Sequence, residues 1–161
     1  MPPLNLPTFW VITLNILGWP VIQLGLAWLF LQLPASLFNS NLILPAARFE
    51  RPLYENLFAI RRWKDLLPDG ASWFRGGFSK RHLHRRDPAY LNRFLQESRR
   101  GEVAHWLMLL AAPVFILWNP PWAVAVMFTY ALLANLPCIL AQRYNRLRFL
   151  ALQRARQRKR S

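Results

Sequence analysis

The sequence alternates between long apolar stretches and charged stretches. Residues 2–47 and 103–142 contain no Asp, Glu, Lys or Arg, whereas residues 48–102 and 143–161 contain every charged side chain. A soluble domain needs polar side chains every few residues along its exposed faces, so two uncharged blocks of this length exclude an ordinary soluble globule. The pattern is typical of a helical membrane protein.

Three apolar segments predict membrane-spanning helices. Residues 8–33 would extend about 39 Å as a helix, longer than the roughly 30 Å of a bilayer core. Residues 103–118 and 122–141 would extend about 24 and about 30 Å, with an Asn-Pro-Pro turn between them. We therefore expect one all-α membrane domain over residues 1–161, whose second and third segments form a hairpin that either spans the bilayer or re-enters it. Four tryptophans are expected to face lipid or the interface: Trp10, Trp19, Trp118 and Trp122.

The charges orient this arrangement. The loop of residues 48–102 has thirteen basic and seven acidic residues, and the tail of residues 143–161 has eight basic residues, which together give the net charge of +14. The positive-inside rule places both regions in the cytoplasm. We expect a multi-pass protein of the cell membrane whose basic side chains contact anionic membrane lipids. Topology already explains these charges, so no nucleic-acid partner is expected.

Common catalytic and metal-binding motifs do not fit this chain. Cys138 is the only cysteine and lies in an apolar run, which excludes an intrachain disulfide. His82 and His84 lack a third ligand at a convincing spacing, and one Glu-x-x-His is only half of a di-iron pattern. The P-loop, the Rossmann fingerprint, the Gly-x-Ser-x-Gly elbow and Cys-x-x-Cys are absent. We expect neither a metal nor a cofactor.

A dense polar cluster lies where the charged loop meets the second apolar segment. Pro88 is suited to begin a helix that continues without a breaker to Pro113. On this helix, Glu97, Glu102 and His105 share one face. Either carboxylate could orient and charge the imidazole, so that His105 acts as a general base towards a hydroxyl group. His105 lies inside the apolar run, where a polar side chain is costly and functional by default.

Two other features of this helix face affect the interpretation. Gly101 leaves a gap in the middle of the face, and Arg100 points the other way. In the alternative interpretation, Glu97 and Glu102 only form ion pairs with nearby arginines.

A second polar cluster ends the third apolar segment. Asn135 lies within the segment, and Gln142, Arg143, Tyr144 and Asn145 follow at its expected cytoplasmic end. Because the two segments form a hairpin, this cluster should return to the side where the first cluster begins. An acyl carbonyl gains negative charge during attack, and Gln142, Arg143 or Asn145 could donate a hydrogen bond to it. Alternatively, Asn135 and Gln142 make hydrogen bonds between the spans.

A second candidate base lies in the charged loop. His82 and Asp87 have the His-x-x-x-x-Asp spacing of glycerolipid acyltransferases, in which the His is the general base and the Asp orients it. The surrounding residues form a basic loop, in which nearby cations do not orient the ring. We therefore rank His82 second to His105.

The motifs of both clusters, and their order along the chain, resemble those of the glycosyl-4,4'-diaponeurosporenoate acyltransferase family. This family acts in the last step of staphyloxanthin synthesis. The resemblance runs from about Arg48 to Leu150. It rests on Trp63-Lys64, Asp69-Gly70, Glu97-Ser98-x-Arg-x-Glu102-x-x-His105-Trp106, Asn135-x-Pro137 and Gln142-Arg143-Tyr144-Asn145-Arg146-x-Arg148.

The resemblance implies a membrane acyltransferase that moves a fatty acyl chain to a sugar hydroxyl of a glycosylated carotenoid or related glycolipid. The acyl donor would be a coenzyme A thioester, a carrier-protein thioester or a lipid. Five residues are assigned to catalysis: His105, Glu102, Glu97, Arg143 and Asn145. Seven are assigned to substrate binding: Gln142, Tyr144, Asn135, Trp106, Arg99, Trp63 and Lys64. The alternative is a non-enzymatic membrane scaffold or assembly subunit, which would tolerate the loss of His105.

Overall fold

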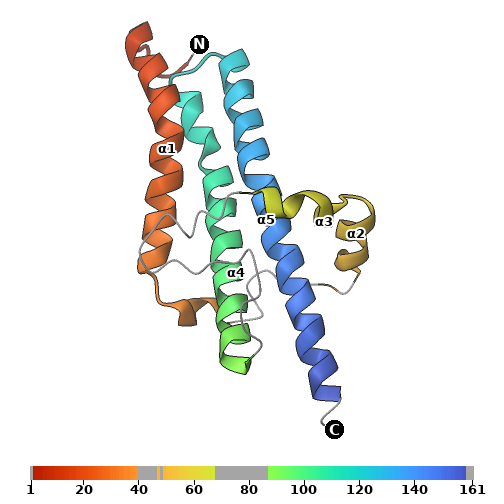
Figure 1. The fold of residues 1–161 in the computed structure, drawn as a ribbon. Helices are drawn as coiled ribbons and strands as arrows, with labels where there is room; N and C mark the ends of the chain where they lie inside the picture. Colours follow the sequence, from red (N-terminus) through yellow and green to blue (C-terminus); the bar gives the residue numbers. More distant parts are fainter. Residues whose placement is uncertain (1, 40–46, 48, 68–86, 159–161) are drawn as a thin grey trace.

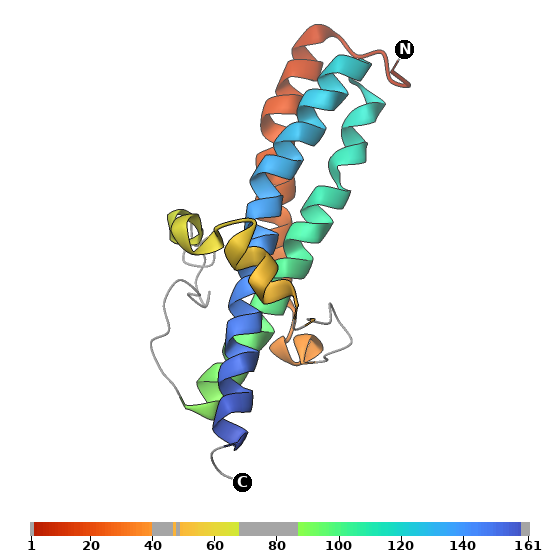
Figure 2. The ribbon, with the colours of Figure 1, turned by 90° about the vertical axis from the view of Figure 1, so that its right-hand side faces the viewer.

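A computed structural model describes residues 2–39, 47, 49–67 and 87–158, and these ranges contain helices and no strands. Three long helices lie side by side along the molecule (Figure 1, Figure 2): α1 (Thr8–Gln32), α4 (Pro88–Leu110) and α5 (Pro121–Arg158). Short elements lie between α1 and α4: η1 (Ala35–Phe38), α2 (Glu50–Asn56), α3 (Ile60–Trp63) and η2 (Lys64–Leu66). The expected all-α class is confirmed.

Three helical stretches are long and apolar enough to cross a membrane: Thr8–Gln32, Pro88–Leu117 and Pro121–Ala155. Large apolar side chains are exposed on each of them, including Phe9, Leu110 and Leu133. Exposed apolar side chains on helices whose backbone hydrogen bonds are satisfied internally suit a lipid surrounding. The chain is therefore a small helical membrane protein.

The helix α4 begins where the sequence predicts. Oδ1 of Asp87 accepts a hydrogen bond of 2.8 Å from the backbone N–H of Tyr90, and Pro88 occupies the first helical turn. The α-helix ends at Leu110, and the chain tightens into η4 (Ala112–Leu117), in which Pro113 has no backbone N–H to donate. The apolar segment predicted at 103–118 is thus the second half of a longer helical stretch that begins in the charged region.

The helix α5 likewise continues from the apolar segment into the basic tail, as far as Arg158. At its other end, the Asn-Pro-Pro turn is tied to α1. The side chains of Asn15 and Asn119 exchange two hydrogen bonds of 2.8 Å, and Nε1 of Trp118 donates to Oδ1 of Asn15 at 2.9 Å. These bonds fix the hairpin of α4 and α5 against the first helix.

Close packing near this turn corrects one expectation about the tryptophans. Trp19 does not face lipid: it is buried, and its ring stacks on Phe115 with centroids 4.8 Å apart. A Cβ atom at Gly18 would lie 3.1 Å from the same phenylalanine ring, so glycine permits this approach. By contrast, Trp10 and Trp122 are exposed, as predicted.

In the other half of the molecule, α4 and α5 remain packed along their lengths. Phe94 and Phe149 have ring centroids 4.0 Å apart. The α2 and α3 helices lie beside α5 (Figure 1), where Tyr54 and Ile60 share an apolar cluster with Tyr144. The predicted hairpin of the second and third segments therefore exists, and α2 and α3 are held against one of its helices.

Candidate active site

The two predicted polar clusters meet at Glu102, whose side chain is fully buried between α4 and α5. Nη1 of Arg143 donates to Oε1 of Glu102 at 3.0 Å. Nη1 of Arg146 lies 2.5 Å from Oε2 of the same carboxylate. A carboxylate removed from solvent needs cationic partners. Glu102 thus has two cationic partners, and both come from the other helix of the hairpin.

Arg143 also reaches a carboxylate that the sequence analysis did not single out. Its Nε and Nη2 atoms donate to the two carboxylate oxygens of Glu50 at 2.5 and 2.8 Å. The hydroxyl of Tyr54 donates to Glu50 at 3.1 Å, and the backbone N–H of Ala47 donates at 2.9 Å. The only signal in the sequence is the i, i+4 spacing of Glu50 and Tyr54 on one helix face. Alternating charges therefore link α2, α5 and α4.

The electrostatics of Glu50 and Tyr54 argue against proton transfer by either group. The hydrogen bond from Arg143 lowers the pKa of Glu50 from its usual 4.5 to about 2, although burial opposes the shift. Burial, assisted by the charge of Glu50, raises the pKa of Tyr54 to about 12. At neutral pH, Glu50 is an anion and Tyr54 is a neutral donor. Both groups therefore position Arg143.

His105 makes its polar contact with the other helix of the hairpin. Its Nδ1 atom lies 3.0 Å from Oδ1 of Asn135, and Nδ2 of Asn135 donates to the carbonyl oxygen of Ala131 at 3.0 Å. The second bond fixes which end of the amide faces the ring. A carbonyl oxygen only accepts hydrogen bonds, so Nδ1 carries a proton in this contact and Nε2 is the ring nitrogen that can accept one.

This contact differs from the predicted one, in which Glu97 or Glu102 orients the imidazole. Both oxygens of Glu102 lie against arginines, and both oxygens of Glu97 accept from Nη1 of Arg100 at 3.0 Å. Both carboxylates pair with arginines, as the alternative interpretation expects, and their catalytic role stays a prediction. Arg100 was predicted to point away, but its long side chain folds back to Glu97 and also donates to the carbonyl oxygen of Leu33 at 2.8 Å.

Three residues assigned to substrate binding make contacts within α2, α3 and α5. The buried hydroxyl of Tyr144 donates to Glu55 and accepts from Nε of Arg61, both at 3.0 Å. The indole of Trp63 donates to a backbone carbonyl at 2.8 Å, and Lys64 pairs with its neighbour Asp65. The Tyr144 contacts fasten the short helices to α5, whereas those of Trp63 and Lys64 stay within the short elements.

The other assigned residues are spread over α4 and α5. Arg99 is buried and donates to the backbone carbonyls of η1 and of the residue after it, at 3.0 and 2.9 Å. Gln142 and Asn145 are half-buried on α5, and Trp106 is exposed beside His105. The amide oxygen of Gln142 is buried and has no hydrogen-bond partner among the described residues.

The competing His-x-x-x-x-Asp pair is only half described. Asp87 caps α4, which is a structural use of its carboxylate. His82 lies outside the described residues, as does His84. In the described part of the chain, no three His, Cys, Asp or Glu side chains are grouped so that they could hold a metal ion.

Together, the fold and the site define a small membrane protein whose polar centre is built between two apolar helices, with an amide-held imidazole beside a chain of buried ion pairs. The chain belongs to the glycosyl-4,4'-diaponeurosporenoate acyltransferase family, whose model matches residues 34–155. It is therefore an acyltransferase, as the resemblance implies, and the scaffold alternative is not supported.

Individual relatives agree with this assignment. The glycosyl-4,4'-diaponeurosporenoate acyltransferase of Staphylococcus aureus strain bovine RF122 / ET3-1 is 32% identical over 140 residues, which cover 84% of each chain. The protein of the same name from strain Newman is 32% identical over 145 residues, which cover 88% of this chain and 87% of the relative. No solved structure gives a significant match.

Proposed function

We propose that this protein transfers a fatty acyl group to a sugar hydroxyl of a glycosylated carotenoid, or of a related glycolipid, at the cytoplasmic face of the membrane. The name shared by the family and its Staphylococcus aureus relatives supports a glycosylated carotenoid acceptor. The exposed apolar side chains of α5 near Asn135 support a lipid-like acceptor body, because they offer it a matching surface: Leu132, Leu133 and Leu136.

The hydrogen bond between His105 and Asn135 carries the catalytic assignment. It holds the ring in one orientation and leaves the basic lone pair at Nε2, which is the state that a general base needs. The ring lies in the apolar half of α4, at a depth where a membrane-bound hydroxyl can approach. Asn135 is therefore a positioning residue, and His105 is the group that contacts the acceptor.

The reaction uses an acyl thioester as donor. The sugar hydroxyl oxygen forms a bond to the thioester carbonyl carbon, and its proton moves to Nε2 of His105. The carbon–sulfur bond then breaks, and the imidazolium returns the proton to the thiolate. The products are an ester and a free thiol. Arg143 lies against Glu102, which is one helical turn before His105 on α4, and its cation stabilises the carbonyl oxygen as it becomes negative.

The test is product formation from a glycosylated carotenoid and palmitoyl-coenzyme A, followed by mass spectrometry at matched abundance of protein in the membrane. His105→Ala should lower the rate by about 10² to 10⁴ and leave the protein in the membrane. His82→Ala should lower it only modestly. Full activity of the His105 variant together with an inactive His82 variant would reverse the assignment.

A further inference from the structure

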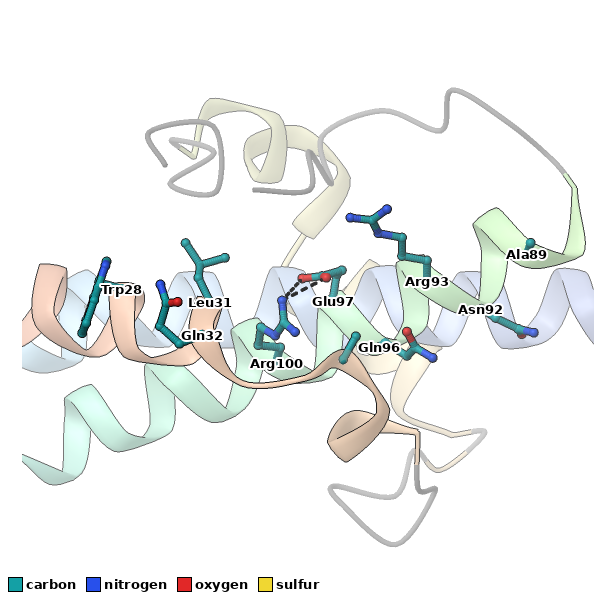
Figure 3. A pocket seen from close by; sticks show the side chains of 10 residues that line it. Trp28, Leu31, Gln32, Ala89, Asn92, Arg93, Gln96, Glu97 and Arg100 are labelled. Atoms are coloured by element: carbon teal, nitrogen blue, oxygen red, sulfur yellow. Dashed lines mark hydrogen bonds and ion pairs between the residues drawn. The ribbon is translucent and has the colours of Figure 1, made fainter. Parts of the chain in front are cut away.

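A groove of about 640 Å³ lies between the C-terminal end of α1 and the N-terminal half of α4 (Figure 3). Its volume is within the range of small-molecule sites. Trp28, Leu31 and Gln32 line it from α1, and Arg93, Gln96 and Arg100 are among the residues that line it from α4. Asn135, Arg143 and Arg146, which contact His105 and Glu102, do not line this groove, so it is a second feature of the molecule.

The lining changes from apolar to cationic along the groove. In Figure 3, Trp28 and Leu31 lie at one end, and Arg93 lies towards the other. Gln32 lies at the Trp28 end, Gln96 lies further towards Arg93, and the ion pair of Glu97 and Arg100 lies between them. The groove therefore suits an elongated molecule with an anionic head, hydrogen-bonding groups and an apolar tail.

Helical geometry connects this groove with the proposed base. Arg93, Glu97, Gly101 and His105 are spaced four residues apart, so each lies about 40° further around α4 than the one before, and His105 lies about 120° from Arg93. The distance from Arg93 to His105 along the helix axis is about 18 Å. Gly101 has no side chain, so only backbone lies at this position between Glu97 and His105.

The apolar end of the groove also lies at nearly the same level along the helices as His105. Phe30 of α1 packs in one cluster with Ala104 and Met108 of α4. Trp28 is two residues from Phe30 on α1, and His105 follows Ala104 on α4. The Trp28 end therefore lies close to the level of His105, and a ligand that enters beside Arg93 reaches the depth of the base at the far end.

We infer that this groove holds the phosphopantetheine arm of the acyl thioester donor, with the phosphate at Arg93 and the thioester carbonyl passed across Gly101 to His105. The two amides of a pantetheine arm complement the amide side chains of the lining, and the acyl chain leaves beside Trp28 and Leu31. The uncharged sugar of the acceptor would not require a cationic side chain such as Arg93, whereas the phosphate of the donor does. The inference rests on the proposed function and names its donor.

Binding is measured apart from turnover, in a His105→Ala background, with radiolabelled palmitoyl-coenzyme A and detergent-solubilised protein. Arg93→Gln should raise the Kd about tenfold, the effect of losing one hydrogen bond to a charged group. Arg62→Gln is the matched control, because Arg62 is an exposed arginine of α3 outside the groove. The control should leave the Kd unchanged.

The proposed path of the thioester across Gly101 to His105 is tested in the active protein. Gly101→Leu should leave the donor Kd unchanged and lower kcat roughly 10²-fold, because it displaces the thioester from the base. Gly101→Ala should lower kcat less than the leucine variant does. Gly25→Leu on α1 is the control, since nothing lies within 4 Å of a Cβ atom there.

Competition identifies the source of the ligand. Palmitoyl-coenzyme A and a palmitoylated carrier protein share the phosphopantetheine arm, so whichever is the donor should compete and lose affinity in Arg93→Gln. Equal competition by phosphatidylglycerol micelles, without competition by free coenzyme A, would make the groove a lipid-headgroup site and overturn the inference. Equal Kd values for the Arg93 and Arg62 variants would also overturn it. Neither result depends on whether His105 is the base, so failure of the proposed function is a separate outcome.

Discussion

Nδ1 of His105 lies 3.0 Å from the amide oxygen of Asn135, which is thirty residues further along the chain and belongs to the other helix of the hairpin. Asn135 is buried, and its amide also bonds to the backbone of its own helix. A neutral amide holds the ring without placing a further charge between two apolar helices, where desolvation of a carboxylate would be expensive. The nearby carboxylate of Glu102 instead binds arginines.

Replacing Asn135 should therefore affect the chemical step. Asn135→Leu removes the acceptor for the Nδ1 proton and should lower kcat about 10- to 100-fold, the cost of leaving one polar partner unsatisfied. Asn135→Asp keeps an acceptor at this place and should retain more activity than the leucine variant. The measurement is kcat and KM for the acceptor, at matched abundance.

Thr129→Val is the control for this pair of variants. The Thr129 hydroxyl donates to the carbonyl oxygen of Ala125, four residues back on the same helix, as Asn135 does to Ala131. The valine variant should keep its kcat. If all three variants lost protein from the membrane but kept their kcat, Asn135 would be a packing residue only.

The ion pair of Glu50 and Arg143 should contribute to stability more than an exposed pair does. A double-mutant cycle with Glu50→Gln and Arg143→Gln should give a coupling energy of about 1 to 3 kcal/mol, since both groups share one buried network. The cycle for Arg51 and Glu55, an i, i+4 pair whose arginine is 41% exposed, should give about 0.3 to 0.5 kcal/mol. The free energy of unfolding in detergent is the quantity to measure. Equal coupling energies in the two cycles would show that the ion pair between α2 and α5 stabilises the fold no more than an exposed pair does.

The same contact predicts a pH dependence. The pKa of Glu50 is lowered from 4.5 to about 2 in the folded protein, mainly by the hydrogen bond from Arg143. A carboxylate with a depressed pKa stabilises the fold fully above its unfolded pKa and loses this effect as the pH falls towards its folded pKa. The difference in melting temperature between the wild-type protein and Glu50→Gln should therefore be constant above about pH 4.5 and shrink between 4.5 and 2. A difference that grew on acidification would contradict the assignment.

The charge distribution predicts which side of the membrane each end occupies. In a Cys138→Ala background, a cysteine introduced at Lys159 should react with a membrane-impermeant maleimide only after the cytoplasmic side is opened. A cysteine at Asn5, which is exposed before α1, should react from the outside in intact cells. Labelling of the Lys159 position from outside would place the whole site on the opposite face.

The helices were predictable because their signals are local. Runs without charge predict the three apolar helices, and Pro88 predicts the start of α4. The ends of the long helices were less predictable. The apolar pattern stops at residue 141, but α5 continues to Arg158, since a basic helix can extend into water beyond the bilayer. Trp19 was placed wrongly because burial between helices and exposure to lipid demand the same apolar residue type.

The sequence by itself determined the all-α membrane class, the hairpin, the family and the two polar clusters of α4 and α5, because hydrophobic periodicity, turn residues and motif order are properties of the chain. Only the tertiary structure decided how those residues pair. Helical spacing places the carboxylates of Glu97 and Glu102 on the same face as His105. Which group each side chain binds, however, depends on residues from other helices. Arg143 and Arg146 of α5 neutralise Glu102, Glu50 of α2 holds Arg143, and the imidazole is left to Asn135. Burial makes an unpaired charge costly, so each carboxylate takes the nearest arginine that the fold supplies.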